Sequence, residues 1–218
     1  VKNSRQARAM EKGTRYGRKM AEEVWQSAEV DALYRLAAAG VRVPTPYLCH
    51  EGVLLMELVT DADGNAAPRL NDVELNRERA LELHAVLLQQ VVLMLCAGVI
   101  HGDLSEFNIL VDASGPVIID LPQAVDAAGN SVASTMLERD VTNLANFFGA
   151  FAPELLGSQY GKEIWGLYQA GLLTPDTPLT GRVEASKEPA DVAAVIREIE
   201  LARHEEEERR RAQMEISA

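Results

Sequence analysis

The sequence predicts an α+β fold arranged in two lobes of unequal size. Hydrophobic residues recur at helical spacing over 19–39 and 79–97, and two short apolar segments around a turn have the pattern of a hairpin. Residues 61–68, rich in Asp, Gly, Ala and Asn, interrupt these patterns as a lobe boundary would. We therefore expect a small first lobe over residues 1–59 and a mainly helical second lobe over residues 60–218.

The composition is that of a globular protein. Of the 218 residues, 47% are hydrophobic and 25% are charged, which excludes a disordered or fibrous chain. The longest unbroken apolar stretch, 91–100, is about half of the ~20 residues that a membrane-spanning helix needs, and no secretory signal opens the chain. We therefore expect a cytoplasmic protein with no membrane partner.

The first predicted helix, residues 19–39, ends at Gly40, where a left-handed residue is favoured. Glu29 lies four residues from an apolar residue on either side and so at the edge of the buried stripe, where a carboxylate needs a partner. Prolines make residues 41–46 extended, and the apolar run 53–59 predicts a buried strand.

The second lobe should be built around the helix 79–97, which is apolar on nearly all sides. A hairpin with its turn at 112–116 follows, and then two helices, 136–151 and 154–170. A linker rich in Pro and Thr leads to a terminal helix from residue 190 onward, whose Glu and Arg residues four apart indicate a solvated face.

Cysteine and charge patterns limit the kinds of site. Cys49 and Cys96 have apolar neighbours and no metal-ligand spacing, so we expect buried thiols. Residues 1–20 hold seven Lys or Arg and one Glu, a local net charge of +6 in a chain of −12. This stretch could contact the phosphates of a nucleotide or of RNA, or it could be a solvated arm, and both interpretations stay open.

Most of the chemical information lies between His101 and Asp120. His101-Gly-Asp-Leu-Ser-Glu-Phe-Asn108 fits the H-x-D-L-x-x-x-N pattern of phosphoryl-transfer enzymes, and Asp120 ends a short strand a dozen residues later. An Asp in such a loop can accept the proton of an attacking hydroxyl, and an Asn oxygen and a carboxylate joined by a hairpin can bind Mg²⁺. We expect Asp103 to be catalytic and Asn108 and Asp120 to be metal ligands, with His101 orienting the backbone.

Four segments resemble the RIO family of atypical protein kinases: AEVDALYRLAAAGVRVPTP, LLMELV, HGDLSEFNIL and IIDLPQAVD. Ser105, where ordinary protein kinases have Lys, and Leu-Pro-Gln after Asp120 are marks of that family. Gly102 stands where ordinary protein kinases have an Arg that binds a phosphate on the activation loop. The resemblance implies a two-lobed protein-kinase-like fold, with a partial small N-lobe and a mainly helical C-lobe carrying the catalytic-loop hairpin. It also implies ATP with Mg²⁺, or Mn²⁺, as cofactors.

The resemblance also implies a nucleotide site. Glu29 would pair with a nucleotide-binding Lys, which would supply the partner that its position demands. Met56 would lie near the adenine, the Glu57 carbonyl and the Val59 amide would bond the adenine edge, and Leu110 would form the floor.

Residues that support the loop can be expected as well. Ala-Pro-Glu at 152–154 matches the motif that ends the activation segment of protein kinases. In those enzymes the motif precedes the corresponding helix, whereas here it follows a helical stretch, so we reject the match. We therefore interpret Pro153 as a helix-start residue and Asp140 as a structural acid that braces the catalytic loop, with His101 and Ser105 as further support.

A glycine-rich phosphate loop and a strand Lys are not found before Glu29. Lys2, Lys12 and Lys19 lie in polar, Arg-rich surroundings and are assigned no role. Because the chain begins at Val1 without Met, we expect that an upstream segment carries both features.

Three functions are compatible with these residues. The first is an ATP- and Mg²⁺-dependent serine/threonine protein kinase that phosphorylates a protein hydroxyl, including its own. The second is a small-molecule phosphotransferase of the aminoglycoside type, although Ser-Glu-Phe at 105–107 stands where those enzymes usually have His-Pro-Gly. The third is a nucleotide-gated ATPase module, acting on ribosomal particles as the relatives of the family suggest, in which Asp120 itself takes the phosphoryl group.

Overall fold

The computed structural model describes residues 28–50 and 52–183. They belong to one compact unit, Val1–Val183, and a second unit, Glu184–Ala218, lies outside the described residues. The basic stretch 1–20 and the terminal helix predicted from residue 190 therefore also lie outside them.

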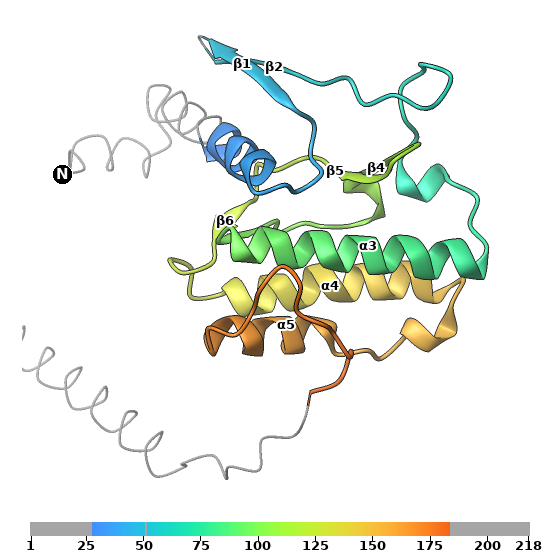
Figure 1. Ribbon diagram of the computed structural model, residues 1–218, viewed down its shortest axis with the longest axis vertical. Coiled ribbons are helices and arrows are strands. Elements are labelled where there is room, and N and C mark those ends of the chain that lie inside the picture. Colours follow the sequence, from blue (N-terminus) through green and yellow to red (C-terminus); the bar gives the residue numbers. More distant parts are fainter. Residues whose placement is uncertain (1–27, 51, 184–218) are drawn as a thin grey trace, which may run out of the picture. The chain divides into compact units, whose positions relative to one another are not determined.

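Three helices form the body of the described unit: α3 (Arg77–Cys96), α4 (Ala133–Gly149) and α5 (Tyr160–Gln169). Figure 1 shows α4 lying between α3 and α5. The Asn76 side chain caps α3 by accepting from the Arg79 amide at 2.8 Å. Gly98, at a φ of 73°, follows the end of α3, where a left-handed residue is favoured.

The core lies between these helices and the hairpin of residues 109–118. Phe148, Leu87, Leu144 and Ile164 are fully buried, and the buried His84 ring meets the edge of Phe148 with the ring centroids 5.6 Å apart. Among the described helices, α3 alone is long and apolar enough to cross a membrane. It packs against α4 and β5 (Gly115–Ile118), as the central helix of a globular core does, so its composition carries no argument for a membrane.

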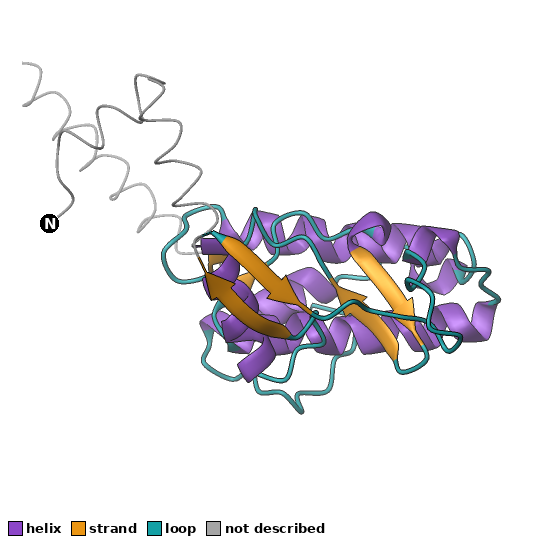
Figure 2. Cartoon of the chain, turned by 90° about the horizontal axis from the view of Figure 1, so that it is seen from above, coloured by secondary structure: helices purple, strands orange, loops and turns teal. Residues whose placement is uncertain are grey.

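The strands pair into three two-stranded antiparallel sheets. Figure 2 shows β1–β2 and β4–β5 as pairs of arrows. The bounds are β1 (Pro46–His50) with β2 (Val53–Met56), β3 (Val99–Ile100) with β6 (Val125–Asp126), and β4 (Ile109–Asp112) with β5. The β4–β5 pair confirms the predicted hairpin. Single-turn 3-10 helices, η1 (Leu70–Asp72), η2 (Glu106–Asn108) and η3 (Pro153–Leu155), join the elements.

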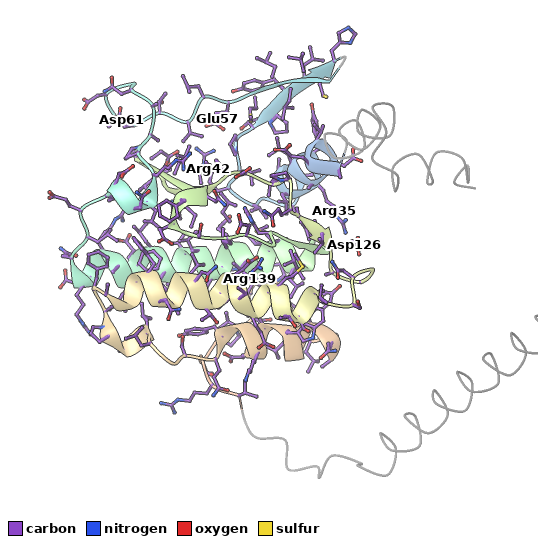
Figure 3. The ribbon with its side chains drawn as sticks, turned by 180° about the vertical axis from the view of Figure 1, so that it is seen from behind. Arg35, Arg42, Glu57, Asp61, Asp126 and Arg139 are labelled. Atoms are coloured by element: carbon purple, nitrogen blue, oxygen red, sulfur yellow. The ribbon has the colours of Figure 1, made fainter. Side chains whose placement is uncertain are left out.

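The described part of the first predicted helix covers residues 28–38, and Gly40 after it has a φ of 79°, as expected. Leu33 and Leu36 bury its apolar face. Arg35, on the same helix, pairs with Asp126 of β6 at 3.3 Å, and Figure 3 shows the two side chains close together. This pair links the helix that carries Glu29 to the chain segment that follows Asp120.

Two predictions about the apolar segments were wrong. The run 53–59 does not form a buried strand: only Val53–Met56 is a strand, and Val53 and Leu55 are 71% and 57% exposed. Burial needs a layer packed over the strand, and within the described residues β2 pairs only with β1. Cys49 and Cys96 are free thiols but exposed: Cys49 lies in β1, where four of five residues are exposed, and Cys96 is the last residue of α3.

The helix predicted over 154–170 is also corrected. Pro153 does start a helical turn, η3, but the chain then leaves the helix, and α5 begins only at Tyr160. Gly157 lies in this break with a φ of 75°. The helix predicted over 136–151 is confirmed as α4, which begins three residues earlier at Ala133.

Candidate active site

Six of the predicted site residues line one cavity of about 440 Å³: Glu29, Met56, Glu57, Val59, Leu110 and Asp120. They come from the helix 28–38, the end of β2 and the segment after it, and the β4–β5 hairpin with the residues after it. Most other lining residues are apolar, among them Leu33, Pro44 and Leu121. A cavity of this size with an apolar lining and a few polar groups suits a small planar ligand such as a nucleobase.

The catalytic loop is held from below by α4. Asp140, which is buried, accepts hydrogen bonds from the amides of Gly102 at 2.7 Å and Leu104 at 3.1 Å. Burial raises the pKa of the Asp140 carboxyl to about 6, although these two bonds favour its charged form. The carboxylate therefore fixes the backbone on both sides of Asp103, as predicted for a bracing acid.

Two further α4 side chains hold the same loop, and the sequence analysis missed both. Asn143 donates to the Leu104 carbonyl at 3.1 Å, and Arg139 donates to the Gly102 carbonyl. Their spacing places them on the same side of α4 as Asp140, one residue before it and three residues after it, and this proximity to the predicted bracing acid is the signal that could have identified them.

Gly102 has a structural reason of its own. Its φ is 82°, and a Cβ built there would lie 2.6 Å from the Gln123 carbonyl oxygen. No larger residue fits without moving the backbone. The loop conformation itself therefore excludes the Arg that ordinary protein kinases carry at this position.

His101 orients the backbone, as expected. Its Nε2 lies 3.0 Å from the Ile119 carbonyl oxygen, and its Nδ1 accepts from the Asp103 amide at 3.3 Å. Burial lowers the pKa of His101, so the ring is neutral with the proton on Nε2. The ring thereby joins the catalytic loop to the strand end that leads to Asp120.

Asp103 and Asn108 lie side by side at the exposed end of the loop. The Asn108 amide nitrogen donates to the Asp103 carbonyl oxygen at 2.9 Å and lies 3.5 Å from the Asp103 carboxylate. These contacts use the nitrogen of Asn108, and its side-chain oxygen makes no hydrogen bond to another described residue. An oxygen with this freedom is what a hard cation needs as a ligand.

Asp120 is the one residue other than glycine with a positive φ, 66°, in the described part of the chain. It lines the cavity together with Glu29. Burial raises the pKa of Glu29, and the negative charge of Asp120 raises it further. Two carboxylates that repel one another in the wall of one cavity provide a place where a cation would be stabilised.

No basic side chain of the described residues forms an ion pair with Glu29 or Asp120. No described ion pair includes Glu29, and the one lysine within the described ranges is Lys162, in α5. The three lysines before Glu29 lie outside those ranges. The predicted pairing of Glu29 with a nucleotide-binding Lys therefore stays a prediction.

Met56, Glu57 and Val59 form the segment that the resemblance assigns to adenine. The Glu57 amide donates to the Thr45 carbonyl at 2.9 Å, and the Val59 carbonyl accepts from the Ala67 amide at 3.0 Å. The Glu57 carbonyl and the Val59 amide have no hydrogen-bond partner among the described residues. One acceptor and one donor, separated by a residue and lining an apolar cavity, match the edge of an adenine.

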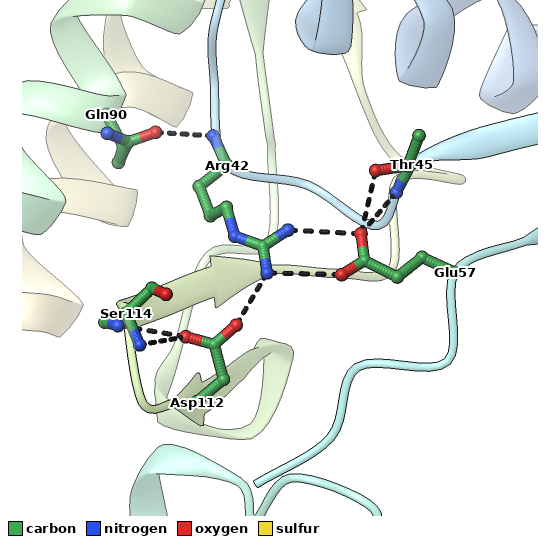
Figure 4. A network of polar contacts seen from close by, with 7 residues as sticks. Arg42, Thr45, Glu57, Gln90, Asp112 and Ser114 are labelled. Carbon is green, nitrogen blue, oxygen red and sulfur yellow. Dashed lines mark hydrogen bonds and ion pairs between the residues drawn. The ribbon is translucent and has the colours of Figure 1, made fainter. Parts of the chain in front are cut away.

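The side chain of Glu57 belongs to a polar network that the sequence analysis did not predict. It pairs with Arg42 through both carboxylate oxygens, and Arg42 also pairs with Asp112 at 2.6 Å. Figure 4 shows these contacts around the Arg42 guanidinium. An Arg flanked by two buried valines in an extended segment was the available signal.

Ser105 is placed at the start of η2, where its carbonyl accepts from the Asn108 amide at 3.0 Å and so helps to turn the loop toward Asn108. Its side chain makes no hydrogen bond to another described residue. The support that it gives to the loop comes from its backbone.

Comparison with known proteins agrees with this geometry. The family model for the RIO domain matches residues 1–159. The chain belongs to the RIO family. Its fold is therefore the α+β fold of protein kinases, and the resemblance carried by the loop motifs is confirmed.

Several relatives are named as RIO-type or RIO1 kinases. The RIO-type serine/threonine-protein kinase Rio1 of Haloferax volcanii is 40% identical over 124 residues, which cover 57% of this chain and 41% of that protein. The Homo sapiens serine/threonine-protein kinase RIO1 is 35% identical over 132 residues, covering 60% of this chain and 23% of that protein. For Rio1 of Thermoplasma acidophilum the identity is 34% over 125 residues, covering 57% of this chain and 63% of that protein. The chain thus spans less than two thirds of each of these relatives.

Proposed function

We propose that this protein is an ATP-dependent serine/threonine protein kinase that uses Mg²⁺, or Mn²⁺, and that phosphorylates protein hydroxyls, including its own. The observation that carries the proposal is the arrangement of Asp103 and Asn108 on a loop braced by α4, which the β4–β5 hairpin connects to Asp120 in the wall of the cavity. Family membership supports the same reaction class.

In this reaction the hydroxyl oxygen of a serine attacks the γ-phosphorus, the bond from that phosphorus to the β,γ-bridging oxygen breaks, and ADP leaves. Asp103, exposed at the loop end, would accept the hydroxyl proton. Asn108 and Asp120 would hold Mg²⁺, which neutralises charge on the triphosphate. The Glu57 carbonyl and Val59 amide would orient the adenine, with Met56 and Leu110 packing against it.

The braced backbone supports this mechanism because the protein contributes mainly by positioning the reacting groups. Phosphoryl transfer depends mainly on positioning and on charge neutralisation. The Asp140 carboxylate and the His101 ring fix the loop that carries Asp103 and the strand end that carries Asp120. Both groups act through the backbone and are assigned no contact with the substrate.

The proposal is tested by following the label from γ-labelled ATP. Label on protein serine or threonine supports it. Label only in free phosphate would replace it with an ATPase module, and label on an aminoglycoside would replace it with a small-molecule phosphotransferase. A contact between the basic stretch 1–20 and RNA of a ribosomal particle is a further part of the proposal, tested by RNA binding with those basic residues replaced.

Two variants test the residue assignments. Asp103→Ala should lower transfer by about 10²–10⁴-fold and spare nucleotide binding, because the general base acts only in the chemical step. Asp120→Ala should weaken the binding of Mg²⁺ and ATP together. Arg79→Met, which removes an exposed ion pair with Glu82 on α3, is the matched control. Full turnover in both Asp variants would refute the assignments.

A further inference from the structure

Arg42 occupies an unusual place in the extended segment that leads to β1. Its backbone amide donates to the Gln90 side chain of α3 at 2.7 Å, and its carbonyl accepts from the Ile118 amide of β5 at 2.9 Å. Both backbone groups are therefore attached to the body that carries the catalytic loop. Only the side chain reaches toward Glu57, as Figure 4 shows.

The guanidinium of Arg42 contacts two carboxylates from distant parts of the chain. Nη1 lies 3.1 Å from one oxygen of Glu57, and Nη2 lies 3.2 Å from the other. Nη2 also donates to Asp112 at 2.6 Å. This two-pronged geometry is specific to arginine, because lysine carries a point charge without a planar fork.

Asp112 attaches the Arg42 guanidinium to the β4–β5 hairpin. Its other oxygen accepts from the amides of Ser114 at 2.7 Å and Gly115 at 3.0 Å, which closes the β4–β5 turn. Strand β4 starts directly after Asn108, and β5 ends two residues before Asp120. The hairpin that holds Arg42 therefore also carries both proposed metal ligands.

On its other side, the Arg42 guanidinium holds the carboxylate of Glu57. This carboxylate also accepts from the Thr45 amide at 2.9 Å and from the Thr45 hydroxyl at 2.8 Å. The Arg42 and Thr45 contacts lower the pKa of Glu57 to about 2, so the group is charged at neutral pH. The side chain is thus fully bonded, and the main-chain carbonyl remains available to a ligand.

We infer that Arg42 is a positioning residue for base recognition: its guanidinium, seated on Asp112, holds Glu57 so that the backbone of residues 57–59 stays at a fixed distance from Asn108 and Asp120. The inference rests on the proposed function, and it adds a residue that touches neither nucleotide nor metal. Without the guanidinium, Glu57 and Asp112 lose their shared positive partner, and the polar link between Glu57 and the hairpin is lost. The packing of Val59 against Val117 of β5 would remain, so the segment would shift but stay attached.

The inference predicts a selective defect. In Arg42→Met the backbone attachments to Gln90 and Ile118 remain, so the fold and the catalytic loop should persist. The segment that reads the base should loosen, so the preference for ATP over GTP should fall by about tenfold. The rate at saturating ATP should change by less than about threefold, because Asp103 and the metal ligands keep their places.

The experiment measures the KM of the full-length protein, including any segment that precedes Val1, for Mg·ATP and Mg·GTP, together with kcat, in four proteins. These are the wild type, Arg42→Met, Arg42→Lys and the control Arg79→Met. Arg42→Lys should restore part of the preference, since it keeps the charge but not the fork. The control should match the wild type. A merely structural role would lower the active fraction and leave the ratio of the two KM values unchanged.

Each outcome decides between the two proposals. If the wild type uses no nucleotide, the proposed function fails. If the wild type turns over ATP but does not prefer it to GTP, or if Arg42→Met keeps the full preference, the positioning role is wrong while the proposed function stands. Should Arg42→Met fail to fold, Glu57→Gln removes the same charge pair from the other end, and the same ratio then decides.

Discussion

The β1–β2 hairpin and the helical body differ in what holds them in place. In the hairpin, Tyr47 and Val53 are 61% and 71% exposed, and the segment after β2 is tied to the rest by charged contacts around Arg42. In the body formed by α3, α4 and α5, Phe148 and Leu87 are fully buried. The difference teaches that the two regions are stabilised differently. Apolar burial dominates in the helical body, whereas in the segment that lines the cavity the ion pairs of Arg42 act beside the packing of Val59.

The largest effect is expected in the core of the helical body. Phe148→Ala removes a fully buried ring that packs edge-on against Phe147 and His84, and it should lower the free energy of unfolding by about 3–5 kcal/mol. Urea denaturation followed by circular dichroism measures this. A loss below about 1 kcal/mol would mean that the body is not the stabilising region.

Asp140→Ala should have the next largest effect. It leaves the buried amides of Gly102 and Leu104 without their acceptor, and it should lower the free energy of unfolding by about 2–4 kcal/mol. Phosphoryl transfer should fall as well, since the loop that carries Asp103 is freed. Asp140→Asn, which keeps one acceptor oxygen, is the control and should lose less of both. Equal stability of the Ala variant and the wild type would contradict the bracing role.

A pH dependence is expected from His84, also in the helical body. Burial lowers the pKa of His84 to about 4 from 6.5, and its Nε2 has no hydrogen-bond partner within residues 28–50 and 52–183. The unfolded chain therefore binds a proton at pH 5 that the folded protein does not, so stability falls as the pH drops from about 6.5 toward 4. We expect a loss of about 2 kcal/mol between pH 8 and pH 5 from this group.

The His84 contribution can be isolated with His84→Leu. The difference in unfolding free energy between this variant and the wild type should change by that amount over the same pH range. A difference that stays constant with pH would show that His84 does not stay neutral in the folded protein.

The smallest effect is expected in the hairpin. Leu55 is 57% exposed on β2, so Leu55→Ala should change the free energy of unfolding by less than about 0.5 kcal/mol. The same urea titration serves as the measurement. A loss comparable to that of Phe148→Ala would erase the contrast between the two regions.

Local sequence patterns predicted much of the helical body and of the catalytic loop. The helix that became α3, its end before Gly98 and the β4–β5 hairpin all follow from periodicity and turn chemistry. The helical stretch around Asp140 and its place after the loop motif predicted a bracing acid, and Asp140 accepts from the amides of Gly102 and Leu104. The spacing of Asn108 and Asp120 also predicted a hairpin between them, and β4–β5 is that hairpin.

Other features could not be predicted because they depend on what packs where. The exposure of residues 53–56 and of both cysteines depends on whether a second layer covers them. The break before α5 depends on Gly157 adopting a left-handed conformation, which the helical pattern of its neighbours concealed. Residue type alone does not carry this information.

The sequence by itself determined the family, the helices with strong periodicity and the residue types at the catalytic loop, because each of these is encoded within about twenty consecutive residues. Only the tertiary structure decided that Arg42 joins Glu57 to Asp112, since those partners lie 15 and 70 residues away along the chain. It likewise decided that Glu29 and Asp120 share a cavity. Contacts at such separations depend on how the elements pack, and local propensity does not encode them.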